Sequence, residues 1–177
     1  MDCFPSDVRF RASWRDYQIR VLDELKNHIK DGRLHVVAAP GSGKTVLGLE
    51  VIRRLNRPAL VLVPTRTIRE QWVDRLAHFF LPEQHVPDWV SIDLWRPGLL
   101  TVATYQALHT AIAGEDAAQD EQEEENDINS VHVSEDDIES SADSGAALVS
   151  VLRQAGIRAL VVDEAHHLRA EWWKSLI

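Results

Sequence analysis

Apolar residues follow two spacings along this chain, one typical of buried strands and the other typical of helices. Continuous apolar runs predict strands at 34–39, 59–64 and 99–105, and a fourth within 157–163. Between these runs, apolar residues recur every three or four positions. That spacing predicts helices at 17–29, 46–55, 67–80, 106–113, 146–156 and 168–177.

Strands without polar alternation, each followed by a helix, indicate a parallel sheet that is covered on both faces. We therefore predict an α/β fold of three layers, with a mostly parallel sheet and helices on either side. Residues 14–177 would form one domain, preceded by a flexible polar stretch at 1–13. Functional residues should lie at the carboxyl ends of the strands, where polar clusters follow Ala39, Val63 and Val162.

Charge is unevenly distributed over the 177 residues, whose net charge is -9. Residues 115–143 hold 13 of the 28 acids and no Lys or Arg, so the remainder carries 15 acids against 19 bases. A mildly basic body leaves nucleic acid open as a partner. The single cysteine, Cys3, and the absence of an apolar run of about 20 residues favour a cytoplasmic protein without a membrane segment.

The acidic stretch at 114–145 is too polar to bury a core of its own, so we expect a disordered insertion. Two interpretations remain open for it. The insertion is either a solvated surface segment or an autoinhibitory strip that competes with DNA for the basic face.

A loop between the first predicted strand and its helix has the composition of a phosphate-binding loop. Its candidate residues are Pro40, Gly41, Ser42, Gly43, Lys44 and Thr45. The glycines allow backbone N–H groups to point at phosphate oxygens, Lys44 can reach the β and γ phosphates, and the Thr45 hydroxyl suits Mg²⁺. The usual first glycine of this pattern is Ala38 here. An ordinary turn would also fit this composition.

A second polar cluster follows the last predicted strand. Asp163 is placed to hold Mg²⁺, and Glu164 could polarise an attacking water as a general base. Together with His166 and His167, these acids could instead form a metal site, although such a site would need further ligands. A solvated turn without chemistry is a third interpretation.

With the phosphate loop, Asp163-Glu164-Ala165-His166 resembles the DEAH box of superfamily 2 helicases and DNA translocases. Residues 14–177 are similar to the first RecA-like domain of that family, in the branch of restriction motor subunits and XPB-like helicases. The resemblance implies ATP hydrolysis with Mg²⁺, with Lys44, Asp163, Glu164 and His166 as catalytic residues. It also implies that His166 links the ATP site to the nucleic-acid side. His167 is typical of the branch, or caps the strand end.

Three further stretches resemble motifs of this family. In the sequence WRDYQ, Gln18 would read adenine, with Arg15 and Tyr17 nearby; alternatively, these residues only begin a helix. The stretches VPTRTIREQW and ATYQAL resemble motifs that contact the nucleic-acid backbone. The residues implied are Thr65, Arg66, Thr104 and Tyr105, although Tyr105 could equally pack in the core. Such contacts, to DNA as we expect, would be independent of base sequence.

The family's second RecA-like domain, which supplies an arginine finger, is not found in these residues. We expect the chain to be a piece of a larger motor that, alone, hydrolyses ATP very slowly. Unwinding and translocation without unwinding, as in a restriction or defence system, both remain open. A P-loop switch or transporter-type ATPase that does not act on nucleic acid is also open, as is a nucleic-acid module with a vestigial nucleotide site.

Overall fold

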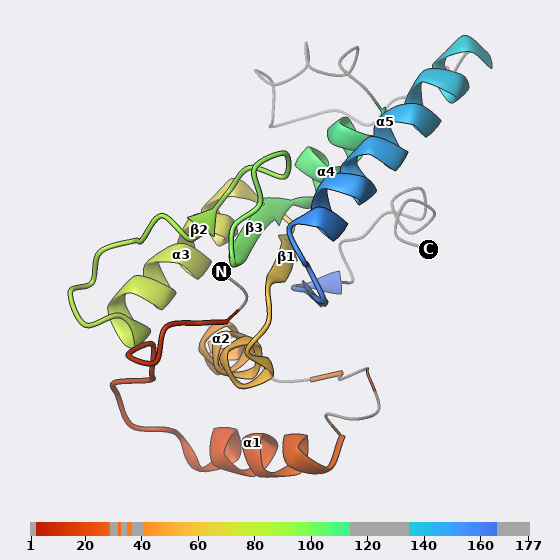
Figure 1. Cartoon of the computed structure of the whole chain (residues 1–177). Helices are drawn as coiled ribbons and strands as arrows, with labels where there is room; N and C mark the ends of the chain where they lie inside the picture. Colours follow the sequence, from red (N-terminus) through yellow and green to blue (C-terminus); the bar gives the residue numbers. More distant parts are fainter. Residues whose placement is uncertain (1–2, 29–31, 33–34, 37–40, 114–134, 166–177) are drawn as a thin grey trace.

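Four parallel strands form the sheet of this protein (Figure 1). The structure, a computed structural model, describes residues 3–28, 32, 35–36, 41–113 and 135–165. The strands lie in the order β2-β3-β1-β4, and every neighbouring pair is parallel. Their bounds are Ala59–Val63 (β1), Val90–Ser91 (β2), Leu100–Thr104 (β3) and Ala159–Val162 (β4). The prediction of an α/β fold with a parallel sheet is confirmed.

Five helices occur among the described residues, and four of them start within two residues of the predicted positions. They are α1 (Asp16–His28), α2 (Lys44–Leu55), α3 (Arg66–Phe80), α4 (Tyr105–Ala113) and α5 (Glu135–Gln154). The predicted strand at 34–39 and helix at 168–177 lie wholly or largely outside the described residues. The two-residue strand β2 was not predicted, because two residues are too few to show a period.

The central strand β1 sends alternate side chains into two apolar cores, as the period of a strand requires. Ala59, Val61 and Val63 pack with residues of α2 and α3. Leu60 and Leu62 pack with residues of α4 and α5. Figure 1 shows the two pairs of helices on opposite sides of the sheet. The predicted three-layer arrangement is therefore present.

Helix α5 begins at Glu135, eleven residues before the predicted start at residue 146. Residues 135–145, which we expected to be disordered, belong to this helix. Farther along, Leu148 and Leu152 pack in one apolar cluster with Leu108 and Ile112 of α4. The packed end provides a nucleus onto which further helical turns can be added at little cost. The rest of the expected insertion, 114–134, lies outside the described residues.

The N-terminal stretch also differs from the prediction of a flexible segment. Val8 is buried, and the backbone amides of Arg9 and Arg11 donate hydrogen bonds to the carbonyls of Phe80 and Phe79. Phe10, between them, stacks on the ring of Trp14 at 3.8 Å between centroids. The apolar residues inside this polar-looking stretch therefore fix it against the end of α3.

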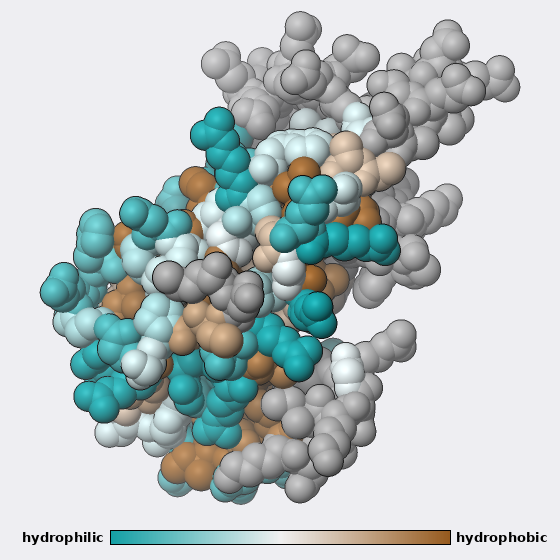
Figure 2. Space-filling view, viewed as in Figure 1, coloured by the Kyte–Doolittle hydropathy of each residue, from teal (hydrophilic) through white to brown (hydrophobic). Residues whose placement is uncertain are grey.

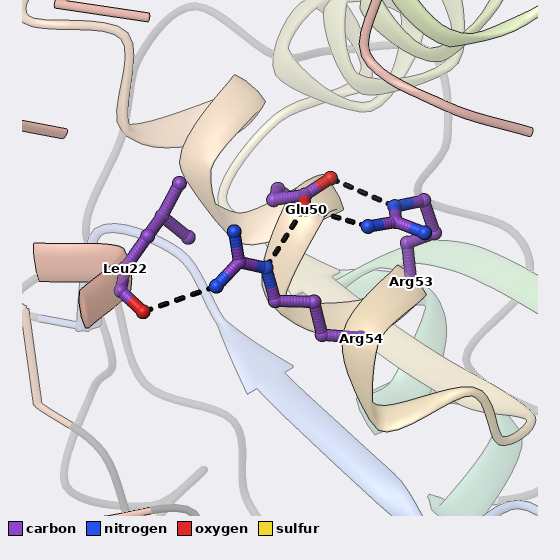
Figure 3. A network of polar contacts seen from close by, with 4 residues as sticks. All are labelled: Leu22, Glu50, Arg53 and Arg54. Atoms are coloured by element: carbon purple, nitrogen blue, oxygen red, sulfur yellow. Dashed lines mark hydrogen bonds and ion pairs between the residues drawn. The ribbon is translucent and has the colours of Figure 1, made fainter. Parts of the chain in front are cut away.

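Helix α1 is held on α2 by apolar and polar contacts. Leu22 and Leu25 of α1 pack on Leu47 of α2. Beside them, the Arg54 guanidinium donates to the Leu22 carbonyl at 3.0 Å and to the Glu50 carboxylate at 2.8 Å (Figure 3). These contacts hold the middle of α1 against α2.

The face of the molecule seen in Figure 2 is mainly hydrophilic, with apolar colour in small separate areas. Among the residues that the structure describes, no helix has both the length and the apolar character needed to cross a membrane.

Candidate nucleotide and nucleic-acid site

The candidate phosphate loop turns into α2 through two glycines in the left-handed region of backbone conformation. Gly41 has φ 72° and Gly43 has φ 91°. Gly43 is the N-cap of α2, so no side chain caps the first amides of this helix. A Cβ atom on Gly43 would lie 2.9 Å from Nε2 of Gln18. Both the backbone conformation and the limited space therefore require glycine at position 43. The uncapped amides at the start of α2 suit phosphate oxygens.

Hydrogen bonds from the start of α1 and from the residue before it hold the carbonyls of this loop. The Arg15 guanidinium donates to the carbonyls of Gly41 and Ser42, at 3.3 and 3.2 Å. The Tyr17 hydroxyl also donates to the Ser42 carbonyl. These bonds turn the loop carbonyls toward α1, which favours the opposite orientation for the loop amides.

Gln18, the candidate adenine reader, is buried with an exposure of 4%. Its Oε1 accepts from the Arg15 backbone amide at 3.0 Å, and its Nε2 donates to the Gly43 carbonyl at 3.4 Å. The structure thus brings Arg15, Tyr17 and Gln18 to the phosphate loop. In this arrangement the Gln18 amide links the start of α1 to the end of the loop.

An ion pair joins the phosphate loop to the acidic turn after β4. Lys44 Nζ lies 2.9 Å from Glu164 Oε1, and each side chain keeps 29% of its surface exposed. Glu164 has φ 51°, a left-handed conformation that is costly for a residue with a Cβ. Two predicted catalytic residues, 120 positions apart in the chain, therefore meet.

Asp163 is held by three neighbouring elements. Its amide donates to the Leu62 carbonyl of β1 at 2.9 Å. Its backbone carbonyl accepts from the Tyr105 hydroxyl at the start of α4. The Oδ2 atom of its carboxylate accepts from the Trp72 indole Nε1 of α3 at 2.8 Å. Backbone and side chain of this residue are therefore both fixed from outside β4.

Tyr105 is protonated in this setting. Burial raises the pKa of its hydroxyl above the ordinary value, and the charges of Asp163 and Glu164 raise it further. Because the phenol keeps its proton, it remains a hydrogen-bond donor to the Asp163 carbonyl.

The four candidate nucleic-acid residues fall into two groups. Thr65 and Arg66 are exposed at the start of α3, where the Thr65 hydroxyl accepts from the Ile68 amide at 3.2 Å as an N-cap. Thr104 and Tyr105 are buried, with exposures of 7% and 2%. The structure thus has Tyr105 in the core, which was the second possibility left open for it.

Thr45 lies in the first turn of α2 and is partly exposed. The hydroxyl of this residue and the carboxylate of Asp163 are hard oxygen donors, the kind that Mg²⁺ prefers. Within the described ranges, no group of three or more His, Cys, Asp or Glu could hold a metal. Pro40, His166 and His167 lie outside those ranges.

The sequence reasoning missed the part played by Trp72. The spacing of apolar residues predicts a helix at 67–80 that includes Trp72, and the motif resemblance of this stretch rests on Thr65 and Arg66. A buried tryptophan usually needs a partner for its N–H group, and that need was the available signal. Its partner, Asp163, is 91 residues away in the chain.

Comparison with known proteins identifies the family. The model of the family described as type III restriction enzyme, res subunit, matches residues 11–177. The chain is 38% identical to "Putative helicase 055L" of Frog virus 3 over 98 residues, 51% of this chain and 22% of the viral protein. It is 36% identical to UvrABC system protein B of Photorhabdus laumondii over 83 residues, 45% of this chain and 12% of that protein. "Putative ATP-dependent RNA helicase QP509L" of African swine fever virus is 34% identical over 73 residues, 40% of this chain and 14% of the relative.

The matched part of this chain thus spans between 12% and 22% of these three relatives. The family match, in contrast, covers nearly all of its residues and includes both the phosphate loop and the acidic turn. The chain therefore belongs to the type III restriction enzyme res subunit family, as the first RecA-like domain of a superfamily 2 helicase or translocase.

Proposed function

We propose that this domain binds ATP with Mg²⁺ and hydrolyses it to drive a helicase or translocase along nucleic acid, with DNA as the expected track. The observation that carries the proposal is the ion pair between Lys44 and Glu164, at 2.9 Å. It supports the proposal because the Lys44 ammonium, which would bind phosphate, and the Glu164 carboxylate, which would act as general base, are in contact beside the uncapped start of α2.

The ion pair suggests how nucleotide binding prepares the site. The phosphates of ATP would attract the Lys44 ammonium away from Glu164. Released from its partner, the Glu164 carboxylate could accept a proton from the attacking water. In the absence of nucleotide the same carboxylate is engaged, which limits unproductive chemistry.

Thr45 and Asp163 would hold Mg²⁺ between them and the phosphates. When bound, the ion supplies positive charge that neutralises the phosphate oxygens during transfer. Gln18 would read the adenine base, as the resemblance implies, with Arg15 beside it. Both residues already contact carbonyls of the phosphate loop. We assign supporting roles at the same site to Pro40 and His166 on sequence grounds alone.

Thr65 and Arg66 are proposed to contact the nucleic-acid backbone. Both are exposed, and they begin a helix, where amides and a cation suit phosphate groups. Contacts of this type carry no base preference. The buried Thr104 and Tyr105 would support the adjoining turn from inside. We further propose a second RecA-like domain as the partner that completes catalysis, and the cytoplasm as the location.

The proposal is tested by the ATPase rate of the whole protein that carries this domain, with and without single-stranded DNA, duplex DNA or RNA. Lys44→Ala and Glu164→Gln should each lower the stimulated rate at least about 100-fold, because they remove the phosphate cation and the general base. Arg57→Ala, which removes an exposed cation just beyond α2, is the matched control and should retain the rate.

A rate that no nucleic acid stimulates would exclude a motor and favour a P-loop switch. A rate that survives both site substitutions would exclude this site altogether. A strand-displacement assay then separates unwinding from translocation.

A further inference from the structure

Trp72 joins the three elements that build the candidate site. It lies on α3 with an exposure of 2%, and its indole Nε1 donates to Asp163 Oδ2 at 2.8 Å. Its ring also fills the space above Gly48 of α2, where a Cβ atom would come within 2.6 Å of the ring. Gly48 is one helical turn after Lys44. The indole is therefore clamped between the helix of the phosphate loop and the carboxylate proposed to hold the metal.

The hydrogen bond selects one orientation of the Asp163 carboxylate. The backbone of this residue is already fixed by the Leu62 carbonyl and the Tyr105 hydroxyl, which leaves the side-chain torsions to be set. With Oδ2 bound to the indole N–H, Oδ1 remains for other ligands. Groups that orient a metal ligand in this way commonly change metal affinity when they are removed.

Helix α3 also carries the exposed Thr65 and Arg66 at its start. Trp72 follows Thr65 by seven residues, which is about two turns or about 10 Å along the helix. Helices move as rigid units over such lengths, so a contact that shifts the start of α3 also shifts the indole. The carboxylate of Asp163 would follow through the hydrogen bond.

We propose that Trp72 is a positioning residue, through which nucleic acid bound at the start of α3 adjusts the metal-holding carboxylate of Asp163. The inference rests on the proposed function of the site. It adds to that function a specific route from the nucleic-acid surface to the metal. A residue that only fills the core would affect folding but not the link between the two ligands.

The test uses the whole protein carrying this domain and two measurements. The first is Mn²⁺ affinity by electron paramagnetic resonance, with a non-hydrolysable ATP analogue present, with and without single-stranded DNA. The second is the ATPase rate under the same DNA conditions. Trp72→Phe removes the N–H donor and keeps an aromatic ring. Trp89→Phe is the control, since its ring lies edge-on to Phe4 in the same core.

We expect the wild type and Trp89→Phe to bind Mn²⁺ more tightly with DNA than without it. Trp72→Phe should bind Mn²⁺ about 10-fold more weakly and lose the dependence on DNA. Its affinity for the ATP analogue in the absence of metal should be unchanged, because the phosphate loop is intact. A second variant with benzothienylalanine at position 72 replaces the N–H by sulfur in a ring of nearly the same shape, and it decides the matter if the phenylalanine variant does not fold.

The outcomes separate the two proposals. Failure of any nucleic acid to stimulate the wild-type ATPase would remove the proposed function. Normal stimulation of the wild type, with Mn²⁺ affinity and DNA dependence unchanged in the position-72 variants, would overturn the role of Trp72 and leave the proposed function standing.

Discussion

Glu50 is a buried acid whose replacement by glutamine should destabilise the domain. The residue is 3% exposed, and its carboxylate accepts three hydrogen bonds of 2.8 Å, two from Arg53 and one from Arg54. Arg54 continues to the Leu22 carbonyl and so connects α2 with α1 (Figure 3). Glu50→Gln keeps the shape of the side chain but replaces one acceptor by an NH₂ group that faces a guanidinium.

The expected loss follows from the geometry of the three bonds. A hydrogen bond to a charged group contributes about 1.5–3 kcal/mol, and removing one partner of a buried pair costs about 3–5 kcal/mol. Arg53 and Arg54 are about one-third exposed and can recover hydration, which lowers the cost. We therefore expect Glu50→Gln to reduce the free energy of unfolding by about 2–3 kcal/mol.

The pH dependence gives a second and more specific signature. Burial raises the pKa of Glu50, but the hydrogen bonds and charges of Arg53 and Arg54 outweigh it, so the pKa lies below the ordinary value. A lowered pKa in the folded state gives stability that is present above the unfolded pKa and is lost as pH falls through the folded one. The difference between wild type and Glu50→Gln should be constant above about pH 5 and shrink below about pH 4.

Urea unfolding followed by circular dichroism at several pH values measures this difference. Glu70→Gln is the control, because it changes an exposed acid on α3 to the same amide. We expect the control to alter stability by less than about 0.5 kcal/mol. Equal effects of the two substitutions, or a Glu50 effect that stays constant down to about pH 3, would refute the reasoning.

Substitutions at three further positions test the geometry of the site. Gly43→Ala should weaken ATP binding at least about 10-fold in calorimetry, since a left-handed alanine costs about 1–2 kcal/mol and its Cβ would meet the Gln18 amide; unchanged affinity would contradict this. Tyr105→Phe should lower the free energy of unfolding by about 1 kcal/mol in urea, because the bond to the Asp163 carbonyl is lost, and a neutral result would show that bond to be unimportant. Thr65→Val should cost about 1 kcal/mol by removing the N-cap of α3, and Thr65→Ser should restore it; equal loss in both would point away from capping.

Most of the fold could be predicted because its signals are local. Ala59–Val63 is apolar at every position, Leu100–Thr104 contains no charged residue, and every residue of both strands is buried. The start of α2 follows two glycines and a serine, and the end of α2 precedes a proline. Each of these signals lies within or beside the element that it predicts, so the chain elsewhere does not alter it.

The two segments whose structure differs from the prediction, at the N-terminus and at the start of α5, depend on contacts between distant parts of the chain. Residues 8–11 look polar in isolation but pair with the carbonyls of Phe79 and Phe80 at the end of α3. Helix α5 extends into acidic sequence, while its other end packs on α4. The composition of a segment indicates whether that segment can become ordered by itself. In both cases, contacts with another helix determine whether the segment is ordered.

In the candidate site, too, the residue types follow from local sequence, whereas their positions depend on distant segments. Sequence identifies Asp163 as the acid after a buried strand, but its position depends on β1, α3 and α4 through Leu62, Trp72 and Tyr105. Those three residues come from segments 58 to 101 positions earlier in the chain, and each contributes one hydrogen bond. A substitution in any of these segments can therefore move the carboxylate without touching the motif itself. The chemistry of the site follows from the acidic turn, and its geometry follows from the packing of the sheet and helices around that turn.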